Sequence, residues 1–175
     1  MAMSGRLGVL AAAGLLGVSC LAAQATPEYQ AKVVLMDKLT RFVDWPAGGD
    51  PGRAFVLAVL GRTPFGDELD NYFAARALKN RAVVIRYPHQ ISELGPCDLL
   101  FICASERPRL AAILDQVKGR PILTVADAEG FAQAGVMVGL VRTDARITFE
   151  VNLGSTRESG LRMAPGFLQL AHIMP

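Results

Sequence analysis

The chain has 175 residues and an almost balanced charge, since 18 Lys and Arg residues stand against 16 Asp and Glu residues and leave a net charge of +2. This balance excludes the strongly basic surface that nucleic-acid binding requires. Hydrophobic residues make up 51% of the chain, which excludes a disordered protein. We therefore expect a folded protein without a nucleic-acid partner.

The first 25 residues have the order of a secretory signal peptide. A short start containing Arg6 precedes an apolar stretch at 7–18, and Ala23-Gln24-Ala25 follows. This order predicts cleavage after Ala25, and the stretch is shorter than the about 20 residues that a membrane-spanning helix needs. We expect residues 1–25 to be removed and 26–175 to form one exported domain with a net charge of +1.

Residues 28–45 show the periodicity of an amphipathic helix. Pro46 disfavours the helical conformation in the residue before it, so we expect the helix to end at Trp45, the only tryptophan. Lys32 lies inside the apolar arc. Its stem would cover apolar surface while its ammonium reaches water, or it would be a positioned cation for a partner carboxylate or a ligand anion.

Continuous apolar runs predict strands that are buried on both faces of a parallel sheet. The runs lie at 55–60, 82–86, 99–103 and 122–125. Helical patterns separate most of them, at 64–78, at 105–117 with Ser105 as its cap, and at 127–131 with Asp127 as its cap.

The pattern changes after residue 135. Strands at 136–141 and 146–151 flank Thr143-Asp144, which predicts an antiparallel hairpin with its second strand near an edge. Two short helices should follow at 155–161 and 165–173, the second with Phe167, Leu170 and Ile173 facing inward. The whole predicts a three-layer α/β domain, with a mostly parallel sheet of about six strands, helices on both faces and a C-terminal antiparallel hairpin.

The sequence contains no constellation typical of catalysis. His89 and His172 lie in different elements, and no spacing fits a metal site. A G-x-S-x-G elbow is absent. Residues 61–66 follow a strand and open a helix as phosphate loops do, but they lack the glycines or the lysine of those motifs; Arg62 is the best candidate if a small anion binds there. We expect no enzyme, no cofactor and no metal.

Cys97 and Cys103 remain after cleavage. A strand of six residues between them would separate their Cα atoms by roughly 20 Å, whereas a disulfide needs less than about 7 Å. We therefore expect no intrachain disulfide. Cys103 should be a buried apolar residue, while Cys97, just before the strand, could be exposed and pair between chains.

Several blocks together resemble the YfiR family of exported bacterial proteins. Tyr29-x-x-Lys32 leads into Phe42-Val43-Asp44-Trp45-Pro46 at the start of the domain. The remaining similar blocks span almost the whole domain in the same order and lie at 60–66, 97–102, 123–131 and 147–152.

The resemblance implies a periplasmic α/β protein, often dimeric, that binds the periplasmic sensor region of a membrane diguanylate cyclase and represses it, which lowers cyclic di-GMP and biofilm formation. It also implies an outer-membrane-associated protein that sequesters the repressor. Family members often carry more cysteines than this chain, which puts redox control in doubt here.

We hypothesise partner contacts at six residues: Trp45, Arg62, Glu150, Asn152, Arg162 and Leu168. Simple exposure on an edge strand would equally explain Glu150 and Asn152. Trp45 would either close the core or anchor a partner. The rival function is a periplasmic small-ligand receptor that uses the carboxyl ends of the parallel strands.

Overall fold

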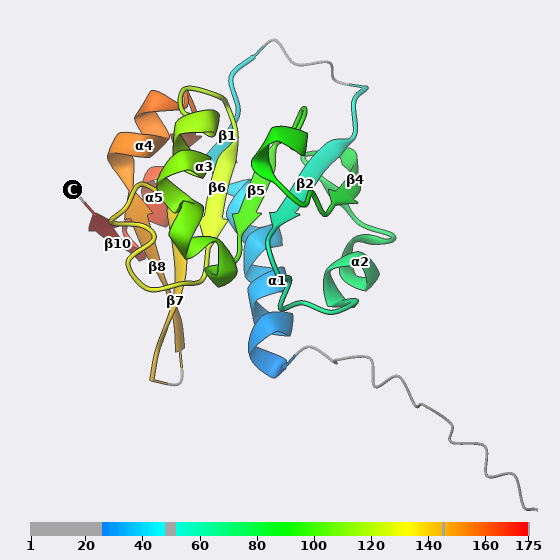
Figure 1. Ribbon diagram of the computed structural model, residues 1–175, viewed down its shortest axis with the longest axis horizontal. Helices are drawn as coiled ribbons and strands as arrows, with labels where there is room; N and C mark the ends of the chain where they lie inside the picture. Colours follow the sequence, from blue (N-terminus) through cyan, green and yellow to red (C-terminus); the bar gives the residue numbers. More distant parts are fainter. Residues whose placement is uncertain (1–25, 48–51, 145, 175) are drawn as a thin grey trace, which may run out of the picture.

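An eight-stranded sheet forms the centre of the molecule, in the order β10-β8-β7-β6-β5-β2-β4-β3 (Figure 1). The computed structural model describes residues 26–47, 52–144 and 146–174. The predicted mixed α/β class is confirmed, with a mostly parallel sheet and an antiparallel hairpin near the C-terminus. The sheet is larger than the expected six strands because the short strands β3 and β10 extend its two edges. The predicted signal peptide lies outside the described residues.

The apolar runs form the middle of the sheet, as predicted. The parallel strands are β2 (Phe55–Leu60), β4 (Arg81–Arg86), β5 (Leu99–Ile102), β6 (Leu123–Ala126) and β7 (Val138–Thr143). Every residue of β2, β5 and β6 is buried, because side chains of a strand point alternately to two faces and both faces are covered. The expectation that residues 82–86 are also buried on both faces was wrong, because exposure alternates along β4 and Val84 is 41% exposed.

Two separate apolar cores lie on the two faces of the sheet. The first joins β2, β5 and β6 to α1 (Pro27–Arg41), α2 (Glu68–Phe73) and α5 (Pro165–Leu168). The second joins the opposite side of these strands to α3 (Leu110–Val117), which follows the short 3-10 helix η2 (Ala104–Arg109). The predicted three layers are therefore present.

The first helix ends four residues earlier than predicted. Its last residue is Arg41, and β1 (Val43–Asp44) then pairs antiparallel with β9 (Arg162–Met163) in a second, two-stranded sheet. Val43 is fully buried in this pairing. The expectation that Pro46 ends the helix at Trp45 was wrong, because residues 43–44 pair with β9 as a strand and the helix ends before them.

The predicted helix at 64–78 is also much shorter. It contains only α2, and β3 (Ala77–Leu78) then pairs antiparallel with β4. Lys79 and Asn80 make the turn, with φ angles of 51° and 60°. Two consecutive residues with positive φ form a tight hairpin turn. The helical spacing of the apolar residues before this turn had led to the prediction of a longer helix.

The hairpin of β7 and β8 (Arg146–Asn152) is confirmed, but β8 is not at an edge. β10 (Ala171–Met174) pairs with it in parallel, where a helix at 165–173 was expected. Of the three apolar residues expected inward, only Phe167 is buried, while Leu170 and Ile173 are exposed. An expected helix at 155–161 occurs as α4 (Leu153–Glu158).

Residues 127–131 form turns rather than the expected short helix. The Asp127 carboxylate, expected as its cap, instead accepts a hydrogen bond from Lys32 Nζ at 3.0 Å. A short 3-10 helix, η1 (Ile91–Glu93), precedes β5. Within the described ranges, no helix is long and apolar enough to cross a membrane.

Candidate functional site

The six residues hypothesised as partner contacts lie at three places in the fold. Those near β1, on β9 and on α5 lie at one end of the molecule, two lie on β8 inside the sheet, and one follows β2 at the opposite end: Trp45, Arg162 and Leu168; Glu150 and Asn152; and Arg62. The structure therefore brings together only half of the hypothesised set.

The two-stranded sheet of β1 and β9 places Asp44 opposite Arg162. Both are exposed, because their neighbours Val43 and Met163 take the inward side of the same pairing. Lys79 lies 3.6 Å from Asp44, and Arg162 has no ion-pair partner among the described residues. Its guanidinium is thus available for an acceptor on another molecule.

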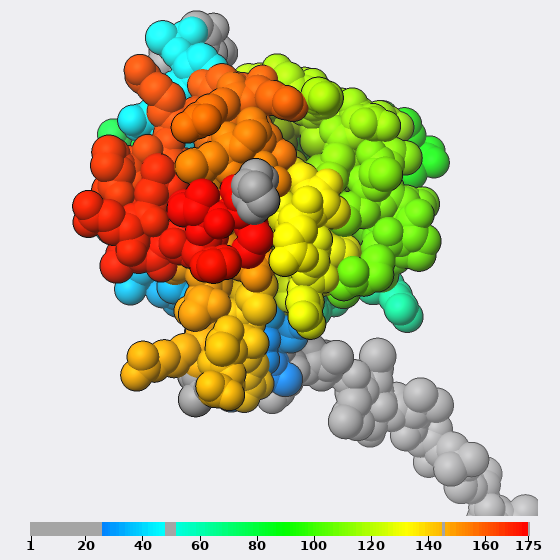
Figure 2. All heavy atoms as spheres, turned by 90° about the vertical axis from the view of Figure 1, so that its left-hand side faces the viewer, coloured from blue at the N-terminus to red at the C-terminus, as the bar shows by residue number. Residues whose placement is uncertain are grey.

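Aromatic rings connect this small sheet to α5. Phe42 stacks on Phe167 with ring centroids 5.8 Å apart, and Phe167 meets Phe149 of β8 edge to face at 5.1 Å. Phe42 is 41% exposed and Leu170, just after α5, is 73% exposed. Figure 2 shows the C-terminal segment, coloured red, at the surface of this side of the molecule.

We call this surface the α5 face and define it by four residues: Phe42, Arg162, Leu168 and Leu170. The exposure of Phe42 and Leu170 was not anticipated from the sequence. A signal was present, since residues 163–174 contain no Asp, Glu, Lys or Arg, and exposed apolar surface without charge is typical of interaction sites.

Trp45 points inward from the same end. The ring is half-buried, meets Phe55 edge to face at 5.5 Å, and donates from Nε1 to the Asp98 carbonyl oxygen at 3.3 Å. A buried indole normally needs such an acceptor. These contacts favour the core-closing interpretation, and a partner contact at Trp45 stays a prediction.

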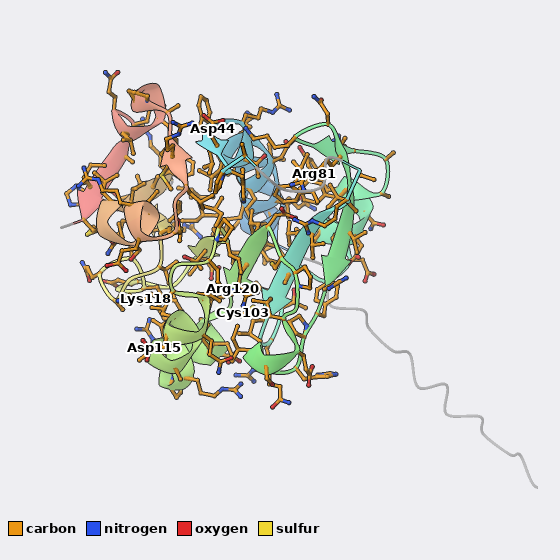
Figure 3. The ribbon with its side chains drawn as sticks, turned by 90° about the horizontal axis from the view of Figure 1, so that it is seen from above. Asp44, Arg81, Cys103, Asp115, Lys118 and Arg120 are labelled. Atoms are coloured by element: carbon orange, nitrogen blue, oxygen red, sulfur yellow. The ribbon has the colours of Figure 1, made fainter. Side chains whose placement is uncertain are left out.

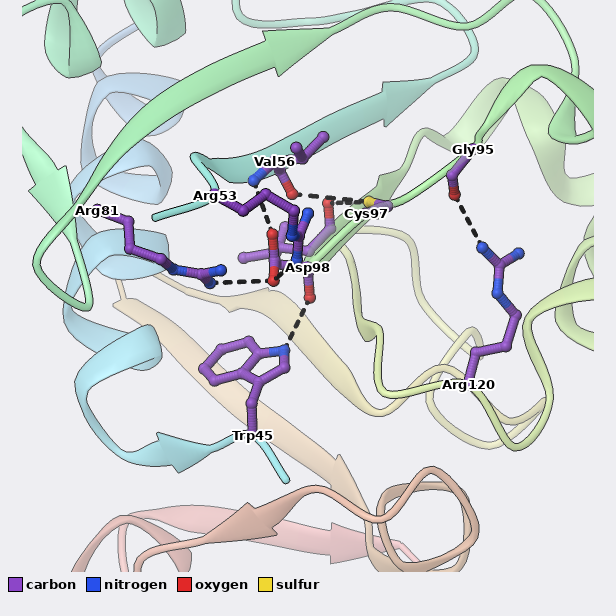
Figure 4. A network of polar contacts seen from close by, with 9 residues as sticks. Trp45, Arg53, Val56, Arg81, Gly95, Cys97, Asp98 and Arg120 are labelled. Atoms are coloured by element: carbon purple, nitrogen blue, oxygen red, sulfur yellow. Dashed lines mark hydrogen bonds and ion pairs between the residues drawn. The ribbon is translucent and has the colours of Figure 1, made fainter. Parts of the chain in front are cut away.

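Asp98 organises the amino ends of β2 and β5 (Figure 4). Asp98 is 3% exposed, and one carboxylate oxygen accepts from Arg53 at 2.6 Å and from Arg81 at 3.0 Å. The other accepts from the Val56 amide at 2.8 Å. Two cations and an amide around one buried carboxylate make a structural anchor.

Asn152 and Glu150 occupy the inner strand β8, so the alternative of simple exposure at an edge was wrong, while a partner contact at these residues stays a prediction. Asn152 is 7% exposed; its Oδ1 accepts from the Ser155 amide and caps α4, and its Nδ2 donates to the Ala132 carbonyl, both at 2.9 Å. Glu150 is half-buried, and its Oε2 has no hydrogen-bond partner in the described part of the chain.

Arg62 lies at the opposite end, where β2 and β5 finish. Strand order reverses between these strands, and such a switch point leaves a crevice at the carboxyl ends. The crevice has a volume of about 570 Å³ and is lined by the loops after β2, β4 and β5, including Arg62, His89, Ser105 and Arg109. Gly61, with φ of +98°, allows the close approach, since a Cβ there would lie 2.5 Å from Ser105 Oγ.

A buried ion pair contributes Asp127 to a neighbouring hollow, which shares Arg62 and Ser105 with this crevice. Lys32 is 2% exposed, and its Nζ lies 3.0 Å from Asp127 and 2.5 Å from Glu28. The interpretation that the Lys32 ammonium reaches water was wrong, because the ammonium is buried. The alternative of a positioned cation was right about the carboxylates, but these belong to this chain and not to a partner. Burial, followed by the nearby Asp127 charge, raises the pKa of Tyr29 to about 12.

Both described cysteines are free and buried. Cys97, which could have been exposed before its strand, is only 7% exposed, and its thiol lies 3.0 Å from the Leu99 carbonyl. Burial raises the pKa of each thiol to about 12. Such thiols are poor nucleophiles at neutral pH. No group of three metal-ligating side chains occurs in the ranges that the structure describes.

A further hollow of about 200 Å³ lies between α3 and α4. Asp115 and Lys118, labelled in Figure 3, line it. Lys118 lies 3.6 Å from Glu158 across the opening. A pair so exposed contributes little to stability, and the hollow is too small for most ligands.

Comparison with solved structures shows the fold. The chain is similar to the ABC domain in complex with L-Trp from Streptococcus pneumoniae, with a TM-score of 0.57 and 10% identity. The similarity covers 84% of this chain and 60% of that one. The chain thus spans about three fifths of that protein's length, and the likeness concerns the α/β architecture alone.

Comparison with protein families is more informative. The YfiR/HmsC-like family model matches residues 29–172, which include the α5 face, the crevice and almost the whole described fold. The chain therefore belongs to the YfiR/HmsC-like family, a family of periplasmic regulatory proteins that act through protein–protein interaction.

Proposed function

We propose that this protein binds and represses the periplasmic sensor region of a membrane diguanylate cyclase and so lowers cyclic di-GMP. The family match over residues 29–172 is the observation that carries the proposal. An outer-membrane-associated protein that sequesters the repressor would relieve the repression. The proposal includes export by residues 1–25, so the N-terminus of the periplasmic protein should be Thr26.

The α5 face is the proposed contact surface for the cyclase. It combines exposed aromatic and aliphatic side chains at Phe42 and Leu170 with an unpaired cation at Arg162. Apolar anchors beside an arginine are the usual composition of the central part of an interface. Glu150 and Asn152 are turned into the fold and are not part of the proposed contact.

Charge reversal at Arg162 tests this surface. In a host that lacks the gene, the wild-type protein should lower cyclic di-GMP and co-purify with a membrane diguanylate cyclase. Arg162→Glu should weaken this binding at least about tenfold, because it places a like charge where a partner acceptor is expected. Cyclic di-GMP should then stay high.

Arg157→Glu is the matched control. Arg157 is equally exposed but lies on α4, outside the α5 face, and its reversal should leave repression unchanged. Equal repression by both variants would contradict the α5 face as the contact surface. An unchanged cyclic di-GMP level on gene deletion, with no cyclase recovered, would contradict the repressor function itself.

The crevice supports a second candidate function, a periplasmic small-ligand receptor. Its place at the carboxyl ends of parallel strands is where such folds bind ligands. The buried carboxylate in its lining, Glu106, is already neutralised by Arg109 at 2.8 Å. Asp127, which lines a neighbouring hollow, is paired with Lys32. Arg62 is left as an exposed cation without an ion-pair partner among the described residues, which suits a small anion.

A thermal-shift screen of amino acids, nucleotides and carboxylates tests this candidate. A specific ligand should raise the melting temperature in proportion to the logarithm of its excess, and Arg62→Ala should abolish the rise. Arg107→Ala, at an exposed position of the same η2 segment outside the crevice lining, is the control. If no compound shifts the wild type, the receptor function is contradicted.

A further inference from the structure

Two hollows adjoin at the carboxyl ends of β2 and β5. The crevice of about 570 Å³ lies between the loops after β2, β4 and β5, and the neighbouring hollow of about 380 Å³ is lined by Tyr29, Cys103 and Asp127 among others. Arg62 and Ser105 line both spaces. We call the two spaces together the double site, because one ligand can contact Arg62 and Ser105 and extend into either.

The charges of the double site cancel except at Arg62. Arg109 Nη2 lies 2.9 and 2.8 Å from the two carboxylate oxygens of Glu106. The Asp127 carboxylate lies 3.0 Å from Lys32 Nζ. Arg62 is exposed and has no oppositely charged partner within the described residues. The site therefore offers one net positive charge, which balances a monoanion and leaves half the charge of a dianion unpaired.

Ser105 supplies a hydrogen-bond donor beside this cation. Its Oγ accepts from the Arg62 amide at 2.9 Å, and no acceptor in the described ranges takes its own proton. A hydroxyl in this state is free to donate to a ligand. His89 also lines the crevice and, as a neutral imidazole, adds a ring N–H but no charge. A guanidinium next to a hydroxyl suits the two oxygens of one carboxylate.

The neighbouring hollow has a largely apolar wall. Tyr29 is held in place by an edge-to-face contact with Phe65, with ring centroids 5.6 Å apart, and the buried Cys103 lies beside it in the lining. Asp127 is the acidic side chain of this wall, and it already accepts a hydrogen bond from Lys32. An ammonium group on a ligand would compete with Lys32 for this carboxylate. An apolar body without an amino group therefore suits the hollow.

We propose that the double site binds a small monocarboxylate with an apolar body and no amino group. Its carboxylate contacts Arg62 and Ser105, and its body lies against Tyr29. The proposal rests on the receptor function of the crevice and adds the class of ligand to it. It is independent of the α5 face, which lies at the other end of the molecule.

Three compounds that share a phenyl ring test the class of ligand in a thermal-shift assay of the exported protein. 3-Phenylpropionate is the monocarboxylate, L-phenylalanine adds an ammonium group, and phenyl phosphate is a dianion at about pH 8. At roughly 10 mM, 3-phenylpropionate should raise the melting temperature by at least about 2 °C. The other two compounds should raise it by less than half as much at the same concentration.

Variants of the two polar contacts test the site itself. Arg62→Gln should weaken the binding of 3-phenylpropionate at least about tenfold in isothermal titration calorimetry, because it removes a charge-assisted contact. Ser105→Ala should weaken it by a smaller factor, about three- to tenfold. Arg107→Gln is the matched control, since Arg107 is exposed on η2 outside the lining of both spaces. Melting curves without ligand check that each variant is folded.

A shift with L-phenylalanine or phenyl phosphate as large as that with 3-phenylpropionate would overturn the class of ligand but leave a receptor function standing. No shift with 3-phenylpropionate would overturn the proposal, and equal affinity of Arg62→Gln and the wild type would overturn the site. Repression is measured separately through cyclic di-GMP, so failure of this proposal would leave the repressor function untouched.

Discussion

The buried charged groups of this protein and its α5 face differ in their exposure and in whether they have partners within the chain. Asp98 at one end of the sheet and Lys32 at the other are buried and surrounded by partners of the same chain, whereas the α5 face exposes Phe42 and Leu170 with an unpaired Arg162 beside them. The difference teaches where function should be sought. Buried charged side chains such as Asp98 and Lys32 stabilise the fold, while the surface that is accessible to a partner is largely apolar.

The largest effect should come from Asp98. Asp98→Ala would leave the guanidinium groups of Arg53 and Arg81 without their shared carboxylate and should cost about 3–5 kcal/mol of unfolding free energy. Urea denaturation followed by circular dichroism measures this loss. A loss below about 1 kcal/mol would show that Asp98 is not the structural anchor of that end.

The Lys32 ion pair should come next. Lys32→Met leaves the buried Asp127 carboxylate unpaired and should cost about 2–4 kcal/mol. The double variant Lys32→Met/Asp127→Leu removes both charges and should recover most of that loss in the same denaturation assay. A double variant no more stable than Lys32→Met would mean that the methylene stem matters more than the ion pair.

A smaller loss should follow from Asn152. Asn152→Ala removes the cap of α4 and the bond to the Ala132 carbonyl, for which we expect about 1–2 kcal/mol. Repression of the cyclase should persist in cells as long as the protein folds. If the variant were fully stable but could not repress, Asn152 would be a contact residue after all.

Alkaline pH should add an effect that is absent at neutral pH. Burial raises the pKa of Cys97 and Cys103 from 9.0 to about 12, so the unfolded chain loses these protons first. The contribution of the two protonated thiols to the unfolding free energy is fully present below about pH 9 and is lost as pH rises towards 12. Urea midpoints at several alkaline pH values should fall less steeply for Cys97→Ala/Cys103→Ala, and equal slopes would contradict the burial effect.

The sequence predicted the middle of the fold well and its periphery poorly. Continuous apolar runs such as residues 55–60, bounded by turn residues, favour a strand covered on both faces, and the structure has such a strand there. Trp45 and Pro46 suggested a helix end, but pairing of β1 with residues 162–163 decided the matter. Such pairing joins segments far apart in sequence, and local spacing carries no information about it.

The candidate site shows the same limit. Arg162 was hypothesised as a partner contact and is exposed as a contact residue should be. Asn152 and Glu150 alternate with apolar residues in a way that predicts an exposed face, but α4 and residue 132 pack on that face, where Asn152 bonds to the Ser155 amide and the Ala132 carbonyl. The apolar spacing of Leu170 and Ile173 suggested a buried helix face, because a short strand and a helix segment cannot be distinguished over so few residues.

The most direct test of the central claim is the cyclic di-GMP level in a host that lacks the gene and carries the wild type, Arg162→Glu or Arg157→Glu at equal abundance. The account predicts a low level with the wild type and Arg157→Glu, and a level as high as in the deletion strain with Arg162→Glu. Full repression by Arg162→Glu, or no repression by the wild type, would contradict it.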